Sequence, residues 1–227
     1  MTDPHDPPTA WWTPLRRALG KVRRSVGVDT FDVFGRAVRP EDREFRAPDG
    51  YRFSWATPAE IRGCDAYHTE LDEGERERGA VRLGFGHRAV IVHHGDTPVF
   101  TMWVNPRNVN VPGAIKRQLH DDQVFIYKAF TSPDHRGKSL YKAGMAFVLA
   151  DLAERGMREL IGYAHVKKKV SRKGLSTLGF DTKGRFWVSF ALGASHVFQS
   201  NQLKASFPVA VKRSGVLDGE LTLEPTT

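Results

Sequence analysis

The chain has 227 residues, with 34 Lys and Arg against 26 Asp and Glu, a formal net charge of +8 and a single cysteine. This length can bury a substantial core without cross-links, and one cysteine excludes both an intramolecular disulfide and a four-cysteine zinc site. No run approaches the ~20 apolar residues that cross a bilayer, and the first residues lack the apolar stretch of a secretory signal. We therefore expect a soluble, cytoplasmic protein whose positive charge favours an anionic partner.

The composition divides the chain into three parts. Residues 1–10 are rich in proline and are expected to be disordered, residues 11–45 form an appendage of one basic helix and one short strand, and residues 46–227 form the main domain. Within 11–26 five cations occur without an acid, and apolar residues recur at spacings of three and four. This pattern predicts an amphipathic helix from Pro14 to Val26, with Thr13 as its N-cap. Its apolar stripe either packs on the domain or lies in the headgroup plane of an anionic membrane.

The remaining pattern alternates strands and helices. Thr57, Pro58 and Glu60 form a capping box, so a helix begins at Pro58. Gly156 is placed to end a second helix, over residues 140–155. Strands are predicted over 31–38, 51–55, 88–92, 99–104, 125–131, 160–166 and 186–190, with another around 207–211; those at 88–92 and 99–104 are joined as an antiparallel hairpin. A hairpin followed by a strand-helix-strand unit predicts an α/β (α+β) protein with a mixed sheet.

The chemistry is expected at the junction from strand to helix, at residues 129–141. Here the positive end of a helix, free backbone N–H groups and the cations Arg136 and Lys138 converge. Such a turn is suited to phosphate. An ordinary solvent-exposed turn is the other reading of this segment alone.

This junction and the segments downstream of it together resemble the GNAT superfamily of acyl-CoA-dependent N-acyltransferases. Residues 131–141 resemble its pyrophosphate loop, Ser171 matches the serine of its Asn-x-x-Ser motif, and residues 178–180, Leu-Gly-Phe, match its terminal motif at the usual spacing. The resemblance extends from about residue 85 to 192. It implies a mostly antiparallel central sheet with a splayed strand pair and flanking helices. It also implies binding of acetyl-CoA or another acyl-CoA without a metal, through Phe130, Thr131, Arg136, Gly137, Lys138, Ser139, Leu140, Tyr141 and Ser171.

The sequence departs from the family pattern at four positions. Ser139 and Tyr141 stand where the family prefers small residues, so the loop must offer its N–H groups past larger side chains. Lys168 replaces the usual asparagine, and Leu175 lies where many members have the tyrosine that protonates the leaving thiolate. The general acid is therefore not identified. A thiolate is a tolerable leaving group because the reference pKa of a thiol is about 8.5.

The implied reaction assigns further roles. The pantetheine arm pairs like an added strand with the free edge of residues 125–131, and the last N–H groups of this strand polarise the thioester carbonyl. The acceptor amine must lose a proton, and His165, which closes the strand opposite Thr131, is the first candidate base. Tyr127 is the second. For both residues, a structural role as a core or surface side chain is the competing interpretation.

The acyl group, the acceptor and the partner stay open. The layout is similar to bacterial GNAT proteins linked to cell-envelope glycans, which implies acetyl transfer to an amine on a small molecule or on a sugar- or lipid-linked intermediate. The alternative is a catalytically degenerate GNAT domain that binds acyl-CoA, an acidic acyl carrier protein or an anionic surface without turnover. Residues 11–26 would serve peripheral contact at the inner membrane face or docking of the carrier protein. A nucleic-acid binder rests only on the positive charge and two basic runs, and we do not expect one.

Overall fold

The computed structural model describes residues 26–64, 73–111, 115–191 and 194–207. The strands are β1 (Val26–Ala37), β2 (Tyr51–Trp55), β3 (Arg88–His94), β4 (Thr97–Asn105), β5 (Asn108–Val111), β6 (Ile115–Gln118), β7 (Gln123–Thr131), β8 (Glu159–His165), β9 (Asp181–Ala191) and β10 (Ala194–Gln199). The helices are η1 (Pro40–Arg43), α2 (Pro58–Arg62), α3 (Glu73–Gly84), η2 (Pro133–His135), α4 (Leu140–Glu154), α5 (Lys169–Thr177) and α6 (Asn201–Ser206). The predicted α/β class with a mixed, mostly antiparallel sheet and flanking helices is confirmed.

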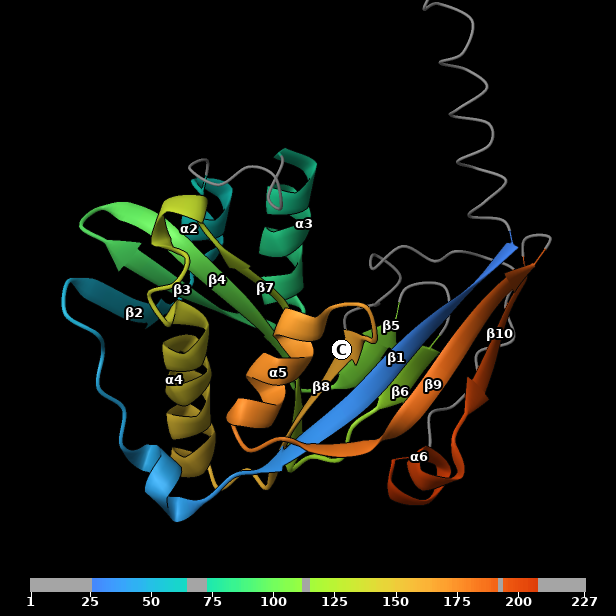
Figure 1. Cartoon of the computed structure of the whole chain (residues 1–227). Helices are drawn as coiled ribbons and strands as arrows, with labels where there is room; N and C mark the ends of the chain where they lie inside the picture. The colour runs from blue at the N-terminus through green and yellow to red at the C-terminus, as the bar shows by residue number, and fades with distance from the viewer. Residues whose placement is uncertain (1–25, 65–72, 112–114, 192–193, 208–227) are drawn as a thin grey trace, which may run out of the picture.

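Eight strands form one sheet in the order β10-β9-β1-β8-β7-β4-β3-β2, and β5 and β6 form a separate hairpin. Every neighbouring pair in the large sheet is antiparallel except β7 and β8, which run parallel. Figure 1 shows the two halves of the sheet diverging from this parallel pair, with α5 close to the point of divergence. The sheet is therefore open at its centre.

Each face of the sheet has its own hydrophobic core. On one face, side chains of α4 and α5 pack against β3, β4, β7 and β8. The opposite face is covered by α2 and α3 over the β3–β4 half, and by the β5–β6 hairpin and α6 over the β1–β8–β9 half. Strand residues alternate between the two cores, as the two-residue repeat of a strand requires.

Local signals in the sequence account for several elements. At the start of α2, the Glu60 N–H donates to the Thr57 hydroxyl at 3.2 Å, and the Thr57 N–H donates back to the Glu60 carboxylate at 2.7 Å. The hairpin between β3 and β4 forms as expected, with Gly95 at φ 59°. Gly156 at φ 68° follows the last turn of α4. Left-handed backbone of this kind favours glycine.

The structure differs from the sequence-based expectation at both ends of the chain. The first strand was expected in an appendage, but β1 lies inside the large sheet, paired with β8 and β9. Of the strand predicted around 207–211, only Phe207 is described, and it directly follows α6 instead of belonging to a strand; residues 208–211 lie outside the described residues. The helix at 14–26 lies outside the described residues, apart from Val26, which begins β1. No helix in the described ranges is both long and apolar enough to span a membrane.

Candidate active site

A cavity of about 640 Å³ opens where β7 and β8 separate. The two strands pair only from Gln123 to Phe125 with Glu159 to Ile161. Beyond this point β7 pairs with β4 alone, so its edge toward β8 is free. The cavity is lined from both sheet faces, and the last residues of the two strands, Thr131 and His165, both contribute to it. The splayed strand pair implied by the resemblance is therefore present.

The loop after β7 has the backbone geometry of an anion site. Gly137 and Ser139 adopt left-handed φ values of 77° and 59°, and α4 begins at Leu140. Successive N–H groups at such turns and at a helix N-terminus point outward and attract anions. Ser139 thus adopts the conformation that the family's glycine favours. Arg136 and Lys138 are exposed beside it, and the Arg136 Nε donates to the Thr131 carbonyl at 3.3 Å.

The predicted catalytic and binding residues divide into two groups. Tyr127, Thr131, Tyr141, His165 and Ser171 line the cavity. The loop residues Arg136 to Leu140 lie outside its lining, and Phe130 packs against the core that contains Cys64 and Ile91. Leu140 is 2% exposed, so its backbone N–H rather than its side chain is the part suited to a ligand.

The His165 ring is held between Asp29 and the backbone of Lys167. The Lys167 N–H donates to Nδ1 at 3.1 Å, so in the neutral ring the proton is on Nε2, which donates to the Asp29 carboxylate at 3.2 Å. Phe31 packs edge-on at 5.1 Å between ring centroids. Both nitrogens therefore have protein partners, and His165 accepts a proton at Nδ1 only if the Lys167 bond breaks. Its role as base stays a prediction with that condition attached.

The Tyr127 side chain is hydrogen-bonded to a histidine that was not among the residues predicted from the sequence. The hydroxyl lies 2.5 Å from Nδ1 of His87. Burial raises the pKa of Tyr127 well above its usual range. Burial, with nearby Arg82 and Arg107, lowers the pKa of His87 from 6.5 to about 4. Both groups are thus neutral near pH 7, and Tyr127 supplies a hydroxyl rather than a basic phenolate.

A buried carboxylate organises cations beside this pair. Glu75 on α3 accepts from Arg82 at 2.7 Å and also binds Lys128. Burial opposes the ionisation of Glu75, but the hydrogen bonds from Arg82 and Lys128 hold its pKa down at about 2. Lys128 has φ 45° at the irregularity where β7 shifts register against β4. No sequence pattern predicts this bulge, because the contacts of two strands produce it.

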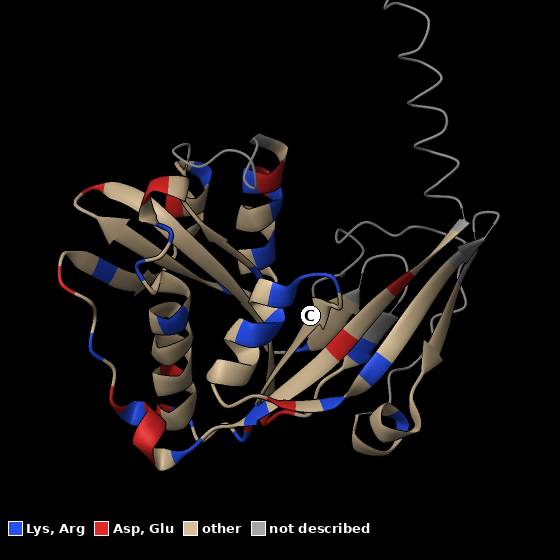
Figure 2. Cartoon of the chain, viewed as in Figure 1, with Lys and Arg blue, Asp and Glu red and all other residues tan. Residues whose placement is uncertain are grey.

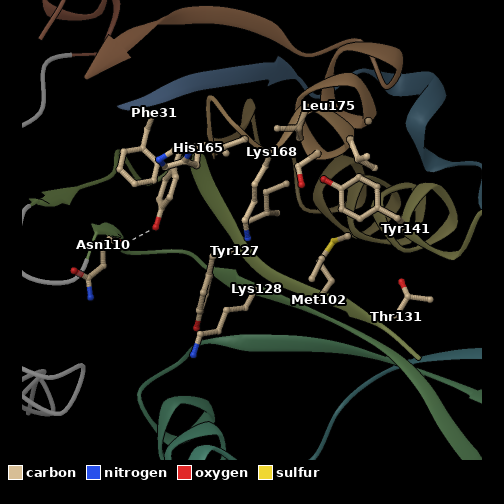
Figure 3. A pocket seen from close by; sticks show the side chains of 18 residues that line it. Phe31, Met102, Asn110, Tyr127, Lys128, Thr131, Tyr141, His165, Lys168 and Leu175 are labelled. Atoms are coloured by element: carbon tan, nitrogen blue, oxygen red, sulfur yellow. Dashed lines mark hydrogen bonds between the residues drawn. The ribbon is translucent and has the colours of Figure 1, made fainter. Parts of the chain in front are cut away.

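The position of the missing family tyrosine is filled by a buried side chain. Leu175 is 3% exposed and belongs to the core under α5. Tyr141, from the first turn of α4, packs against the same core and lines the cavity. Figure 3 shows the two side chains on the same side of the cavity. Burial raises the pKa of Tyr141 to about 12, so its hydroxyl carries a proton at neutral pH.

Basic residues gather at the start of α5 (Figure 2). They are Lys167, Lys168, Lys169, Arg172 and Lys173. Of these, Lys168 alone is in the cavity lining. In the described part of the chain no group of three or more His, Cys, Asp or Glu side chains is placed to hold a metal ion.

Solved structures with the same fold are known, although neither a protein-family model nor a curated protein matches the sequence. A GNAT-family acetyltransferase, described as putative, from Novosphingobium aromaticivorans matches at TM-score 0.52 and 14% identity, over 78% of this chain and 67% of that one. A tandem GNAT protein from the clavulanic acid biosynthesis pathway matches at TM-score 0.51 and 16% identity, over 87% and 61%.

A third structure, an aminoglycoside N-acetyltransferase in complex with CoA, matches at TM-score 0.45 and 16% identity, over 60% and 92%. The chain spans 65% of the length of a matching Staphylococcus epidermidis protein of unknown function and 58% of a Drosophila protein. The sheet order, the splayed parallel pair and the two matches with TM-scores of 0.51 and 0.52 lead to one conclusion: the chain has the fold of the GNAT N-acetyltransferases.

Proposed function

We propose that the protein transfers an acyl group from coenzyme A to an amine. Three adjoining features carry this proposal. They are the loop of residues 131–141 before α4, called the phosphate loop from here on, the free edge of β7, and the cavity between β7 and β8. A thioester donor is a diphosphate joined to an extended amide arm, and these features match its parts in the same order. We propose acetyl as the acyl group.

In the proposed reaction the amine nitrogen forms a bond to the thioester carbonyl carbon. The tetrahedral intermediate collapses, the carbon–sulfur bond breaks, and the sulfur leaves as a thiolate that takes up a proton. The amine nitrogen loses one proton over the same sequence. Tyr141 is the proposed donor to the thiolate, since it brings a hydroxyl group to the cavity on the side where Leu175 lies. The phenolate that it leaves regains its proton from water.

The test measures thiol release from acetyl-CoA and from longer acyl-CoA in the presence of a panel of amines. Mass spectrometry of the acylated product and calorimetry of CoA binding accompany it. Thiol release that depends on the amine supports the enzyme. CoA binding without amine-dependent thiol release supports the alternative, a degenerate GNAT domain that binds acyl-CoA, a carrier protein or an anionic surface.

A cytoplasmic location with peripheral contact at the inner membrane face is a further part of the proposal. It depends on the composition of residues 11–26, five cations without an acid beside two tryptophans. A membrane location would bring the protein to a sugar- or lipid-linked acceptor. Co-sedimentation with anionic and neutral vesicles tests it: binding to the anionic vesicles that is lost when residues 1–26 are deleted supports the contact, provided that the shortened chain stays folded.

A further inference from the structure

The lining of the cavity includes basic and aromatic side chains, and no acid is among its described residues. Its eighteen lining residues include two lysines and one histidine, and none of those described is Asp or Glu. One wall is aromatic: Phe31 and Tyr163 meet edge-on at 5.5 Å between ring centroids, and Tyr163 and Tyr127 both stack on Phe125. The cavity therefore offers positive charge and apolar ring faces.

Lys168 forms no ion pair with any residue of the described part of the chain. Three other basic side chains of the site have acidic partners: Lys128 with Glu75, Arg172 with Asp32, and His165 with Asp29. The backbone of Lys168 is fixed, since its N–H donates to the His165 carbonyl at 2.8 Å and its own carbonyl accepts from Arg172 at 3.1 Å. Figure 3 shows its side chain pointing into the cavity toward Tyr127. A fixed backbone thus presents an ammonium group to whatever fills the cavity.

The location of Lys168 assigns it to the acceptor rather than to the phosphates of the donor. In Figure 3, Thr131 and Tyr141 lie at one end of the cavity and His165 at the other, and Lys168 lies between them with its nitrogen near Tyr127. The phosphate loop follows Thr131 directly in the chain. The donor phosphates would therefore bind beyond the Thr131 end, away from the Lys168 ammonium.

The charge of the cavity restricts the acceptor. A positive potential disfavours an ammonium ion relative to the neutral amine that must attack the thioester, and it repels polycations. An acceptor needs a compensating attraction to bind there. We propose that the acceptor is an amine that also carries an anionic group, a carboxylate or a phosphate, and that Lys168 binds this group. This inference rests on the proposed acyl transfer.

The test compares amines that differ in one charge. Initial rates with acetyl-CoA are measured for L-phenylalanine against L-phenylalaninamide, and for O-phosphoethanolamine against ethanolamine; the two pairs separate a carboxylate from a phosphate. The expected result is a kcat/KM at least about tenfold higher for the anionic member of one pair. Lys168→Met should remove this preference and leave the calorimetric affinity for CoA unchanged. Lys168→Arg should retain the preference, and Lys169→Met, an exposed neighbour outside the lining, is the matched control.

Binding without turnover separates this inference from the proposed function. With CoA present, N-acetyl-L-phenylalanine and N-acetylphosphoethanolamine are titrated against N-acetyl-L-phenylalaninamide. Binding of an anion that Lys168→Met abolishes, in a protein that releases no thiol, refutes acyl transfer and leaves the anion site standing. Equal or better use of the neutral amines, with no preference in binding, overturns the inference. A Lys168→Met variant that loses CoA affinity and keeps its acceptor preference assigns the lysine to the donor, and overturns it as well.

Discussion

The Tyr127 hydroxyl and Nδ1 of His87 lie 2.5 Å apart, which joins β7 to the segment between α3 and β3. The His87 pKa is lowered from 6.5 to about 4, mainly by burial, so the unfolded chain binds more protons than the folded one between these values. The contribution of His87 to the free energy of unfolding is therefore complete above pH 6.5 and is lost as the pH falls toward 4. The full contribution is about 3 kcal/mol, of which about 2 kcal/mol is lost by about pH 5.

Urea unfolding between about pH 7.5 and 5 measures this loss, above the range where Glu75 titrates, since the Glu75 pKa is held at about 2. His87→Gln, which does not titrate, should flatten the dependence of the unfolding free energy on pH. His93 and His135, whose pKa values are also lowered, contribute in the same direction, so some slope remains. An unchanged slope in His87→Gln contradicts the assignment.

Replacing the two cations of the phosphate loop should weaken CoA binding without unfolding the protein. Arg136 and Lys138 are exposed, so replacing both by alanine removes charge but little packing. Charged hydrogen bonds contribute about 1.5–3 kcal/mol each, so calorimetry should show CoA binding at least about tenfold weaker. Lys142→Ala, an exposed cation on α4, is the control. Wild-type affinity in the double variant would remove this loop from the donor site.

The role of His165 is tested by the pH dependence of the acyl-transfer rate. Its Nδ1 is occupied by the Lys167 N–H, and its Nε2 by Asp29. If the Lys167 hydrogen bond breaks and His165 acts as the base, His165→Gln should lower kcat/KM and remove one limb of its pH profile. An unaltered pH profile in the variant would exclude His165 from the proton transfer.

Tyr141 predicts a modest effect on turnover. Its raised pKa, about 12, keeps the hydroxyl protonated, but a thiolate also leaves unaided. Tyr141→Phe should therefore lower kcat by about tenfold, less than the roughly 10²–10⁴-fold typical of a general acid, with little change in KM. The loss should shrink with a donor whose thiol is more acidic. A Tyr141→Phe variant with wild-type kcat on both donors excludes the residue as the acid.

A substitution at Gly144 tests how α4 packs on the sheet. A Cβ at this position would lie 2.6 Å from Cε1 of Phe100, which is fully buried. Gly144→Ala should lower the unfolding free energy by about 1–3 kcal/mol despite the better helix propensity of alanine. Gly84→Ala, at the end of α3 with no atom within 4 Å of the added Cβ, should instead be neutral or stabilising by up to about 1 kcal/mol. Equal effects of the two substitutions would contradict this packing argument.

Local sequence determined those features that a few adjacent residues can produce. The capping box at Thr57, the turn at Gly95 and the end of α4 at Gly156 all depend on backbone preferences within about four residues. The phosphate loop belongs to the same group, because its N–H groups come from one continuous strand-loop-helix segment. The order of this loop and of the motifs that follow it in the sequence was enough to predict the GNAT fold.

Only the tertiary structure decided what depends on distant segments. The position of β1 between β8 and β9 and the burial of His87 against Tyr127 both join residues far apart in sequence. The proposed acceptor side of the cavity has the same origin, since its lining combines Lys168 with aromatic side chains from β1, β7 and β8. The sequence alone tells which side chains carry a charge. Its effect on a substrate depends on which counterions the fold brings near it, and that is a property of the folded chain.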